Sequence, residues 1–171
     1  MKKILVLTLI AGLFTGLNAS AQQDKSKRPS PPAKVSETIA SGATITIDYS
    51  QPSVKGRTIG KEIAPYGEVW RTGANEATVF EISKDVRVEG KMLSAGKYGL
   101  YTIPGAEKWT IIFNKTWDQW GTNYKEDEDA LRVEVKPSKA ATTTEQMTFN
   151  IAKNGTVSLL WGDKKVDFQV K

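Results

Sequence analysis

The stretch "QMTFNIAKNGTVSLLWGDKKVDFQV", residues 146–170, carries the clearest structural signal in the chain. Apolar and polar residues alternate on both sides of Asn154 and Gly155. Such alternation is typical of a strand with one face in a core and the other in solvent. An Asn-Gly pair favours a two-residue hairpin because both residues accept positive φ. We therefore predict an antiparallel hairpin here, and a further hairpin closed by "WGDKK", residues 161–165.

The same two-residue period recurs along most of the chain before this hairpin. About nine short runs along the chain, including those of residues 146–170, have this period and are separated by Gly-, Asn- and Ser-containing turns. No sustained helical stripe is found after the first 21 residues. This pattern predicts an all-β fold, an antiparallel β-sandwich of jelly-roll-like or Ig-like type, with a closed barrel as the alternative. The runs before the hairpin lie at residues 44–49, 78–83, 86–93, 97–103, 108–114 and 130–136.

The N-terminal 21 residues have the features of a secretory signal peptide. A short cationic start precedes an apolar run, and Ala19, Ser20 and Ala21 form an A-x-A cleavage signal. No cysteine stands at that point, so we expect no lipid anchor, and no later apolar run predicts a membrane span. We expect a periplasmic or secreted protein, cleaved after Ala21. Residues 22–34 predict a Pro-rich extended tether, and residues 35–171 a single sandwich domain.

Composition excludes several kinds of chemistry. The chain contains no His and no Cys. This excludes Ser-His-Asp and Cys-His catalysis, zinc sites of the usual types, haem and iron–sulfur clusters. The acidic run at Glu126–Asp129 lacks the Gly and the terminal Glu of an EF-hand, so we read it as a solvated loop. We therefore predict no metal site and no cofactor.

The net charge gives no indication of a nucleic-acid partner. The formal charge is +5, and removal of Lys2 and Lys3 with the signal peptide leaves 22 basic and 19 acidic residues, hence +3. Basic residues form no block beyond "KSKR" at residues 25–28. Proteins that bind nucleic acid usually cluster their charge on one face or helix, so we expect no such partner.

The first candidate site is "PYGEVWRTGANEAT", residues 65–78. We expect Trp70 and Arg71 to end a strand, a turn to include Asn75, and Glu76 to begin the return. In a structural corner, Trp70 packs in the core, Arg71 stacks or pairs with Glu76, and Asn75 caps the turn. In a ligand site, Arg71 binds a carboxylate or phosphate while Asn75 orients it. The sequence leaves both alternatives open.

The second candidate site is "NKTWDQWGTNY", residues 114–124. Trp117 and Trp120 flank Asp118 and Gln119 in a predicted loop. Indole faces beside acids and amides suit a sugar, which presents both C–H faces and hydroxyl groups. The alternative is that the two Trp residues cover an open end of the sandwich. Glu76 and Asp118 form a pair for carboxylate-based hydrolysis if the two motifs meet in space.

Several segments resemble one family of exported bacterial proteins. They are "YSQPSVKGR" (49–57), "PYGEVWRTGANEAT" (65–78), "LSAGKYGLYTIPG" (93–105), "WTIIFNK" (109–115) and "QWG" (119–121). In this order they are similar to domain-of-unknown-function family 2911, from about residue 28 to the C-terminus. The resemblance implies a signal-bearing β protein, and it assigns no catalytic role to any residue.

Taken together, these observations predict a non-catalytic binding protein of the cell envelope. The expected ligand is a carbohydrate or a small anionic group, held between the motifs at residues 70–76 and 117–121. Two alternatives remain open at this point. One is a hydrolase of envelope glycans that uses Glu76 and Asp118, and the other is a scaffold protein that acts through an exposed sheet edge.

Overall fold

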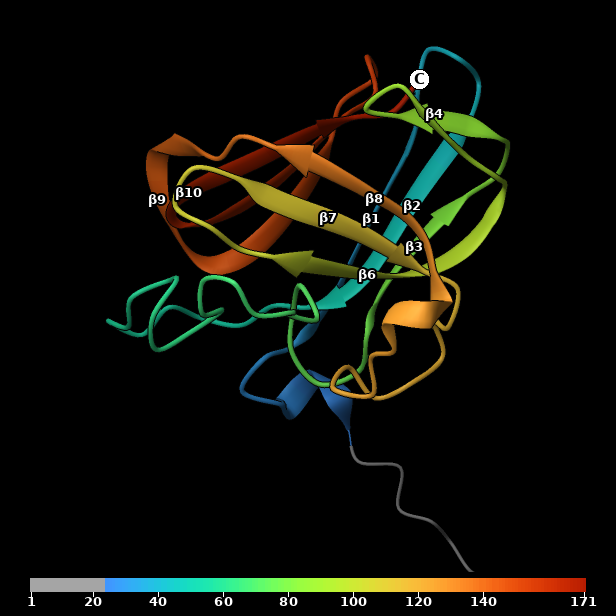
Figure 1. Cartoon of the computed structure of the whole chain (residues 1–171). Helices are drawn as coiled ribbons and strands as arrows, with labels where there is room; N and C mark the ends of the chain where they lie inside the picture. The colour runs from blue at the N-terminus through green and yellow to red at the C-terminus, as the bar shows by residue number, and fades with distance from the viewer. Residues whose placement is uncertain (1–23) are drawn as a thin grey trace, which may run out of the picture.

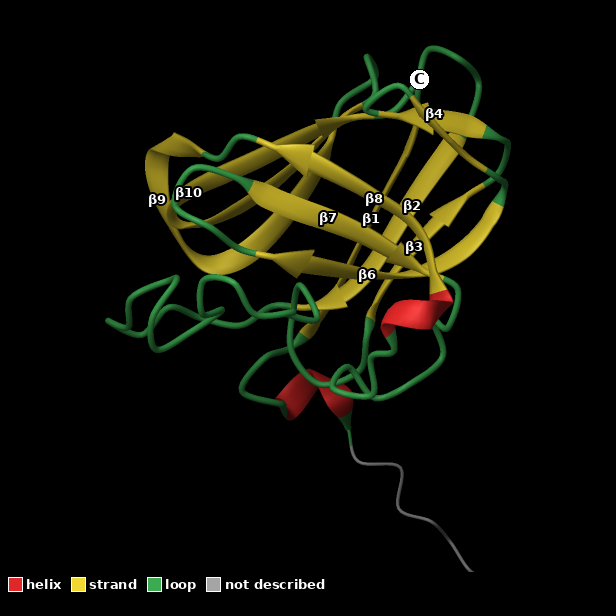
Figure 2. Ribbon diagram, viewed as in Figure 1, coloured by secondary structure: helices red, strands yellow, loops and turns green. Residues whose placement is uncertain are grey.

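The computed structural model describes residues 24–171, so the expected signal peptide and cleavage point lie outside the described residues. Ten strands and two short 3-10 helices make up the described chain (Figure 2). The helices are η1 (Lys25–Lys27) and η2 (Glu126–Glu128). The strands are β1 (Pro32–Thr38), β2 (Thr44–Ser50), β3 (Thr78–Ile82), β4 (Val86–Val88), β5 (Lys91–Leu93), β6 (Gly96–Ile103), β7 (Trp109–Asn114), β8 (Asp129–Val135), β9 (Ser138–Ile151) and β10 (Thr156–Gln169).

The strands form one large antiparallel sheet and two hairpins. The large sheet has the order β1-β2-β3-β6-β7-β8, while β9 pairs with β10 and β4 with β5. The long β9–β10 hairpin lies over one face of the large sheet (Figure 1). This arrangement confirms an antiparallel β-sandwich, and it is not closed into a barrel.

The main core fills the space between the two layers. Phe168 of β10 contacts Phe80 of β3 and Phe113 of β7, with ring centroids 6.1 and 6.0 Å apart. Tyr49 of β2 meets Phe149 of β9 edge to face at 5.0 Å, and its hydroxyl accepts a hydrogen bond from the Phe149 backbone N–H. Edge-to-face rings add to the apolar area that they bury. These aromatic contacts bind the hairpin to the sheet.

The prediction of a separate last hairpin at "WGDKK" is wrong. Residues 156–169 form one bent strand, β10, whose register against β9 shifts on both sides of Gly162. Gly162 has a φ of 57°, and a Cβ there would lie 2.9 Å from Cδ1 of Ile59. A bulge of this kind bends a strand without ending it. The alternation therefore continues on both sides of the bulge, which explains why the sequence suggests two strands.

Strand β1 begins at Pro32, inside the segment for which the sequence predicts a tether. It pairs with β2 from Pro32 opposite Ser50 to Thr38 opposite Thr44. Ala33 and Val35 pack against the core and provide the apolar side of the strand. The strand lies at the edge of the sheet, where a proline is tolerated because its missing N–H is not needed for the ladder.

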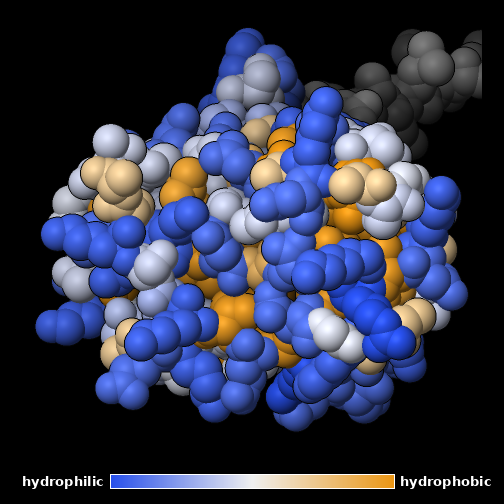
Figure 3. All heavy atoms as spheres, turned by 90° about the horizontal axis from the view of Figure 1, so that it is seen from above, coloured by the Kyte–Doolittle hydropathy of each residue, from blue (hydrophilic) through white to orange (hydrophobic). Residues whose placement is uncertain are grey.

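The face of the molecule seen from above is mainly polar. Seen from above, hydrophilic side chains cover most of the molecule, and apolar residues show between them (Figure 3). Within residues 24–171, no helix has the length and apolar character needed to cross a bilayer.

Candidate functional site

Three segments that are distant in sequence meet at one end of the molecule. They are the N-terminal segment around η1, residues 70–77, and residues 115–128 (Figure 1). Beneath them, Ala77, Tyr101 and Ile112 form a small buried cluster, separate from the main core. Tyr101 and Ile112 are paired residues of β6 and β7, and the neighbouring residues Leu100 and Phe113 point into the main core. The three segments therefore cover the outer face of the large sheet.

The two motifs singled out from the sequence lie side by side. The backbone N–H of Ala77 donates to the carbonyl of Gln119 at 3.0 Å, and that of Gly121 donates to the carbonyl of Asn75 at 3.1 Å. Glu76 and Trp120 form an isolated antiparallel bridge between them. Nothing in the sequence indicates this pairing, because the hydrogen-bonded residues are more than 40 positions apart.

A groove of about 610 Å³ opens between these segments. Five of the eight candidate site residues line it, namely Glu76, Trp117, Asp118, Gln119 and Trp120. Trp117 and Trp120 are 36% and 48% exposed, so neither side chain is consumed by core packing. The remaining lining residues come from the N-terminal segment, from β1, β2 and β3, and from the residue before β3: Lys25, Arg28, Pro32, Asp48, Tyr49, Ser50, Val79 and Ala77.

Trp70 has the structural role that the corner alternative gives it. Its ring stacks on Trp161 with centroids 5.0 Å apart and an interplanar angle of 10°, and it meets Trp109 edge to face at 6.3 Å. Its indole N–H donates to the carbonyl of Gly73 at 3.2 Å. The strand expected before Arg71 does not form, since Trp70 makes only an isolated bridge with Thr102.

Asn75 also supports the structure rather than the groove. Its φ is 62°, and its amide donates to the Ser30 carbonyl and to the Ser50 hydroxyl, both at 3.2 Å. Asparagine tolerates this left-handed conformation better than most residues. Asn75 thus connects the corner to the N-terminal segment and to the end of β2.

Substitution of Asn75 tests this role. Asn75→Ala removes two hydrogen bonds and places alanine in the left-handed region, so we expect a loss of about 1–3 kcal/mol in the free energy of unfolding. Asn75→Gly keeps the backbone conformation accessible and loses only the amide contacts. We expect it to cost less than alanine in urea denaturation. Equal stability of Asn75→Ala and wild type would contradict the role.

Glu76 is paired with the N-terminal segment and not with Arg71. Arg28 Nη1 lies 3.0 and 2.8 Å from the two carboxylate oxygens of Glu76, and Lys25 Nζ lies 3.1 Å from one of them. Partial burial acts to raise the pKa of Glu76, but hydrogen bonds from its own backbone N–H, Arg28 and Lys25 hold it at about 2. Glu76 is therefore an anion throughout the physiological range of pH.

The two cations line the groove but are not among the site residues predicted from the sequence. Lys25 and Arg28 belong to the "KSKR" block at residues 25–28, and nothing in the sequence connects this charge to a partner. The segment predicts an extended tether because of its prolines and polar residues. Only the fold shows that it folds back over Glu76, since the contact spans 48 residues.

The low pKa of Glu76 predicts a pH-dependent contribution to stability. The folded pKa, about 2, lies below the ordinary value of 4.5. The contribution is therefore present above pH 4.5 and is lost as the pH falls towards 2. Because the Glu76 side chain is 40% exposed, solvent screening limits it to about 0.2–1 kcal/mol.

Urea denaturation of wild type and Glu76→Gln at several pH values measures this contribution. We expect the difference in the free energy of unfolding between them to shrink from pH 5 to pH 2. Arg28→Met removes a partner of Glu76 and keeps the carboxylate. Its free energy of unfolding should therefore also depend less on pH than that of wild type. A wild-type minus Glu76→Gln difference that stays constant over this range would contradict the assignment.

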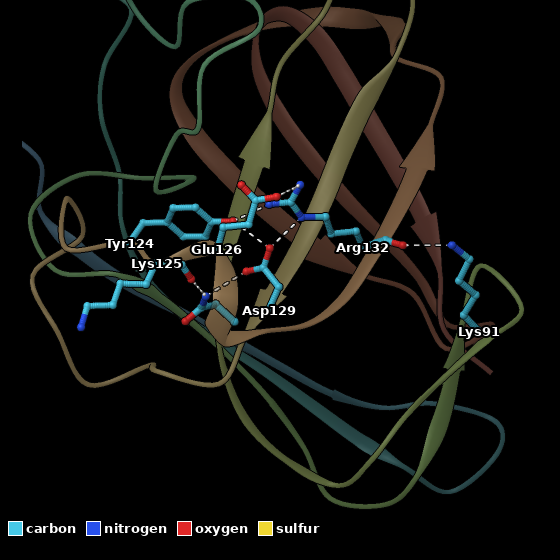
Figure 4. Close-up of polar contacts among 7 residues, drawn as sticks. Lys91, Tyr124, Lys125, Glu126, Asp129 and Arg132 are labelled. Carbon is cyan, nitrogen blue, oxygen red and sulfur yellow. Dashed lines mark hydrogen bonds and ion pairs between the residues drawn. The ribbon is translucent and has the colours of Figure 1, made fainter.

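A polar network anchors the far end of the 115–128 loop (Figure 4). Asp129 accepts hydrogen bonds from Arg132 Nε at 2.6 Å, from the Tyr124 hydroxyl at 2.7 Å and from the buried Asn114 amide at 2.8 Å. Glu126 of η2 adds an ion pair with Arg132 at 3.1 Å. Burial, together with Asp129, raises the pKa of Tyr124 to about 12. This network fixes the loop that carries both groove tryptophans.

The residues at this end do not form an evident metal centre. Within residues 24–171, no three or more acidic side chains gather closely enough to hold a metal ion. Glu76 and Asp118, the carboxylates expected to act together in hydrolysis, line the same groove. Glu76 is nevertheless paired with the cations Lys25 and Arg28.

Fold and site together define a class: an open antiparallel β-sandwich with an aromatic-lined groove over the outer face of its large sheet. The chain belongs to the family described as Protein of unknown function (DUF2911), whose model matches residues 30–170. This match confirms the resemblance carried by the five sequence segments. No curated protein and no solved structure matches the chain.

Proposed function

We propose that this protein is a non-catalytic binding domain for a neutral carbohydrate, which lies in the groove against Trp117 and Trp120. The observation that carries the proposal is the exposure of these two indoles on a groove of about 610 Å³. Small-molecule sites usually have volumes of roughly 300–1,000 Å³. Aromatic rings on such a surface offer faces for the C–H groups of a sugar.

The charges in the groove favour a neutral ligand over an anion. Lys25 and Arg28 are both engaged by Glu76, and Asp48 lies 3.7 Å from Lys34. Asp118 makes no ion pair or hydrogen bond within the described chain, residues 24–171. An approaching anion would therefore meet a free carboxylate and no free cation. Sugar hydroxyls, in contrast, can donate to Asp118 and to the other oxygens of the groove.

The loop that presents the indoles is held in place before any ligand arrives. The Gln119 amide donates to the Tyr101 hydroxyl at 3.1 Å and to the Thr116 carbonyl at 3.0 Å. Lys97 Nζ lies 4.9 Å from the centre of the Trp117 ring. A site that is already ordered loses less conformational entropy on binding.

The hydrolase alternative has less support. A glycosidase needs a carboxylic acid that is protonated near neutral pH, and its pKa is raised for that purpose. Glu76 has the opposite character, with a pKa of about 2 and two cationic partners. The scaffold alternative predicts no small-molecule pocket, whereas this surface contains a groove.

We place this binding role outside the cytoplasm, in the periplasm or the medium. The support is the signal-peptide pattern of residues 1–21. N-terminal sequencing of the protein released by its native host, or from the periplasm of an expression host, tests it. A first residue of Gln22 is the expected result, and an intact Met1 on the cytoplasmic protein would contradict it.

A glycan array screened with the purified protein tests the binding role and identifies the sugar. We expect at least one neutral glycan to be retained by wild type and weakly or not at all by Trp120→Ala. Loss of one stacked indole should reduce affinity by about tenfold or more. Met92→Ala, which removes an exposed apolar side chain of β5 outside the groove, is the control and should bind as wild type does.

A further inference from the structure

We propose a second binding site, for the carboxylate group of a small apolar acid, in the cavity beside Arg71. This cavity has a volume of about 390 Å³ and is separate from the groove of the carbohydrate proposal. Its walls include Val69, Trp70, Tyr101, Thr122 and Tyr124, together with Arg71 itself. The proposal does not depend on carbohydrate binding.

The guanidinium of Arg71 lacks a partner within the protein. None of its nitrogens forms an ion pair or hydrogen bond within residues 24–171, and its Nε is buried with no acceptor. Buried polar groups in folded proteins are nearly always hydrogen-bonded. The Arg71 side chain is partly buried, so the buried Nε without an acceptor is an unusual feature. The two cations that line the groove, Lys25 and Arg28, both have Glu76 as a partner.

The surroundings of Arg71 favour an anion with an apolar body. Of the described residues that line the cavity, Arg71 is the only charged one. Tyr124 provides an aromatic wall, and its ring packs on that of the buried Tyr101, with centroids 4.9 Å apart. Val69 is exposed at the cavity and extends the apolar surface. A carboxylate can accept two parallel hydrogen bonds from a guanidinium, while the rest of the ligand lies against the rings.

The chain is built to keep Arg71 in this position. A Cβ at Gly121 would collide with Cδ of Arg71 and lie 3.0 Å from its Cβ. The absence of a side chain at residue 121 therefore leaves room for the aliphatic stem of Arg71. Gly121 is fixed in turn by its hydrogen bond to the carbonyl of Asn75. The "QWG" segment thus serves both surfaces, with Trp120 on the groove and Gly121 behind Arg71.

Benzoate is a suitable probe, because it joins a carboxylate to an aromatic ring of a size that fits the cavity. Benzamide has the same shape without the charge, and inorganic phosphate has charge without the apolar body. We expect benzoate to shift the amide resonances of residues 69–71 and 121–124 in nitrogen-15 correlated NMR spectra of the whole protein. We expect benzamide and phosphate to bind at least about tenfold more weakly.

Arg71→Met keeps most of the stem that packs on Gly121 and removes the charge, so it should weaken benzoate binding by at least about tenfold. Arg87→Met is the matched control, because Arg87 is an exposed residue of β4, at the far end of the molecule from the 115–128 loop (Figure 1). It should bind benzoate as wild type does. Thr122→Trp, which fills the exposed rim of the cavity and leaves Arg71 intact, should also abolish binding.

Three results would overturn the proposal: no benzoate-dependent shifts in wild type, equal binding by wild type and Arg71→Met, or tighter binding of phosphate than of benzoate. If Arg71→Met does not fold, Thr122→Trp decides the question on its own. Failure of carbohydrate binding in the glycan array leaves these outcomes unchanged, since the two experiments use different probes and different variants.

Discussion

Trp161→Ala is expected to lower the free energy of unfolding by about 3–5 kcal/mol, which is the usual cost of removing a large aromatic side chain from a core. Trp161 is a fully buried residue of β10, stacked on Trp70 at 5.0 Å. Its substitution leaves a cavity between the hairpin layer and the corner at residues 70–76. The loss includes the aromatic stacking as well as the buried area.

Urea denaturation followed by circular dichroism measures this effect, with Trp120→Ala as the matched control. Trp120 is the same residue type in an exposed position, so its removal should change stability by less than about 0.5 kcal/mol. A cost below about 1 kcal/mol for Trp161→Ala would show that the Trp70–Trp161 stack does not stabilise the fold in the expected way.

Gly155→Ala is the second substitution with a large expected effect, about 2–5 kcal/mol. Gly155 lies in the turn between β9 and β10 with a φ of 86°, a conformation that costs other residues roughly 1–2 kcal/mol. A Cβ there would also collide with the carbonyl oxygen of Val170. Overpacking of this kind adds about 1–3 kcal/mol. The Gly155 carbonyl accepts a hydrogen bond from the Val170 N–H at 2.9 Å, so the two backbones cannot separate freely.

Gly90→Ala separates these two contributions. Gly90, in the turn between β4 and β5, has a similar φ of 81°, and no atom lies within 4 Å of the position that a Cβ would take. It should cost only the conformational part, about 1–2 kcal/mol. Thermal or urea unfolding of both variants gives the comparison. Equal costs would show that the contact with Val170 has no energetic weight.

The sequence predicts the strands well because their signal is local. Alternation of side chains decides which face of a strand is buried, and the predicted runs at residues 44–49, 78–83 and 108–114 each contain a strand or lie within one. Bulges carry no such signal. The sequence around Gly162 therefore predicts a turn, although β10 continues through this residue. The start of β1 is missed because Pro32 and the prolines before it are typical of a tether, and only the place of β1 at a sheet edge makes Pro32 acceptable.

The candidate site shows the same limit. Local composition selects two motifs that lie side by side in the fold, at residues 70–76 and 117–121, but it cannot divide their residues between structure and surface. Trp70 and Trp120 are the same residue type in equally polar contexts, yet one stacks in the core and the other lines a groove. That difference depends on contacts with β10 and with the N-terminal segment, which are far away in sequence.

The long-range partners also change the chemistry that the sequence suggests. Arg71 and Glu76 are close in sequence and of opposite charge, so a pair between them is the natural expectation. In the fold, Glu76 pairs with Arg28 and Lys25, and Arg71 faces a separate cavity. The one site predicted from the sequence thus corresponds to two separate surfaces, for which we propose a carbohydrate and a carboxylate ligand.

Carbohydrate binding by Trp117 and Trp120 is best tested by calorimetric titration of the strongest neutral glycan from the array into wild type, Met92→Ala and the double variant Trp117→Ala/Trp120→Ala. We expect equal affinity for wild type and Met92→Ala, and no measurable binding by the double variant while its unfolding transition stays close to that of wild type. Binding by the double variant at wild-type affinity, or no neutral glycan bound by wild type, would contradict a carbohydrate site in the groove.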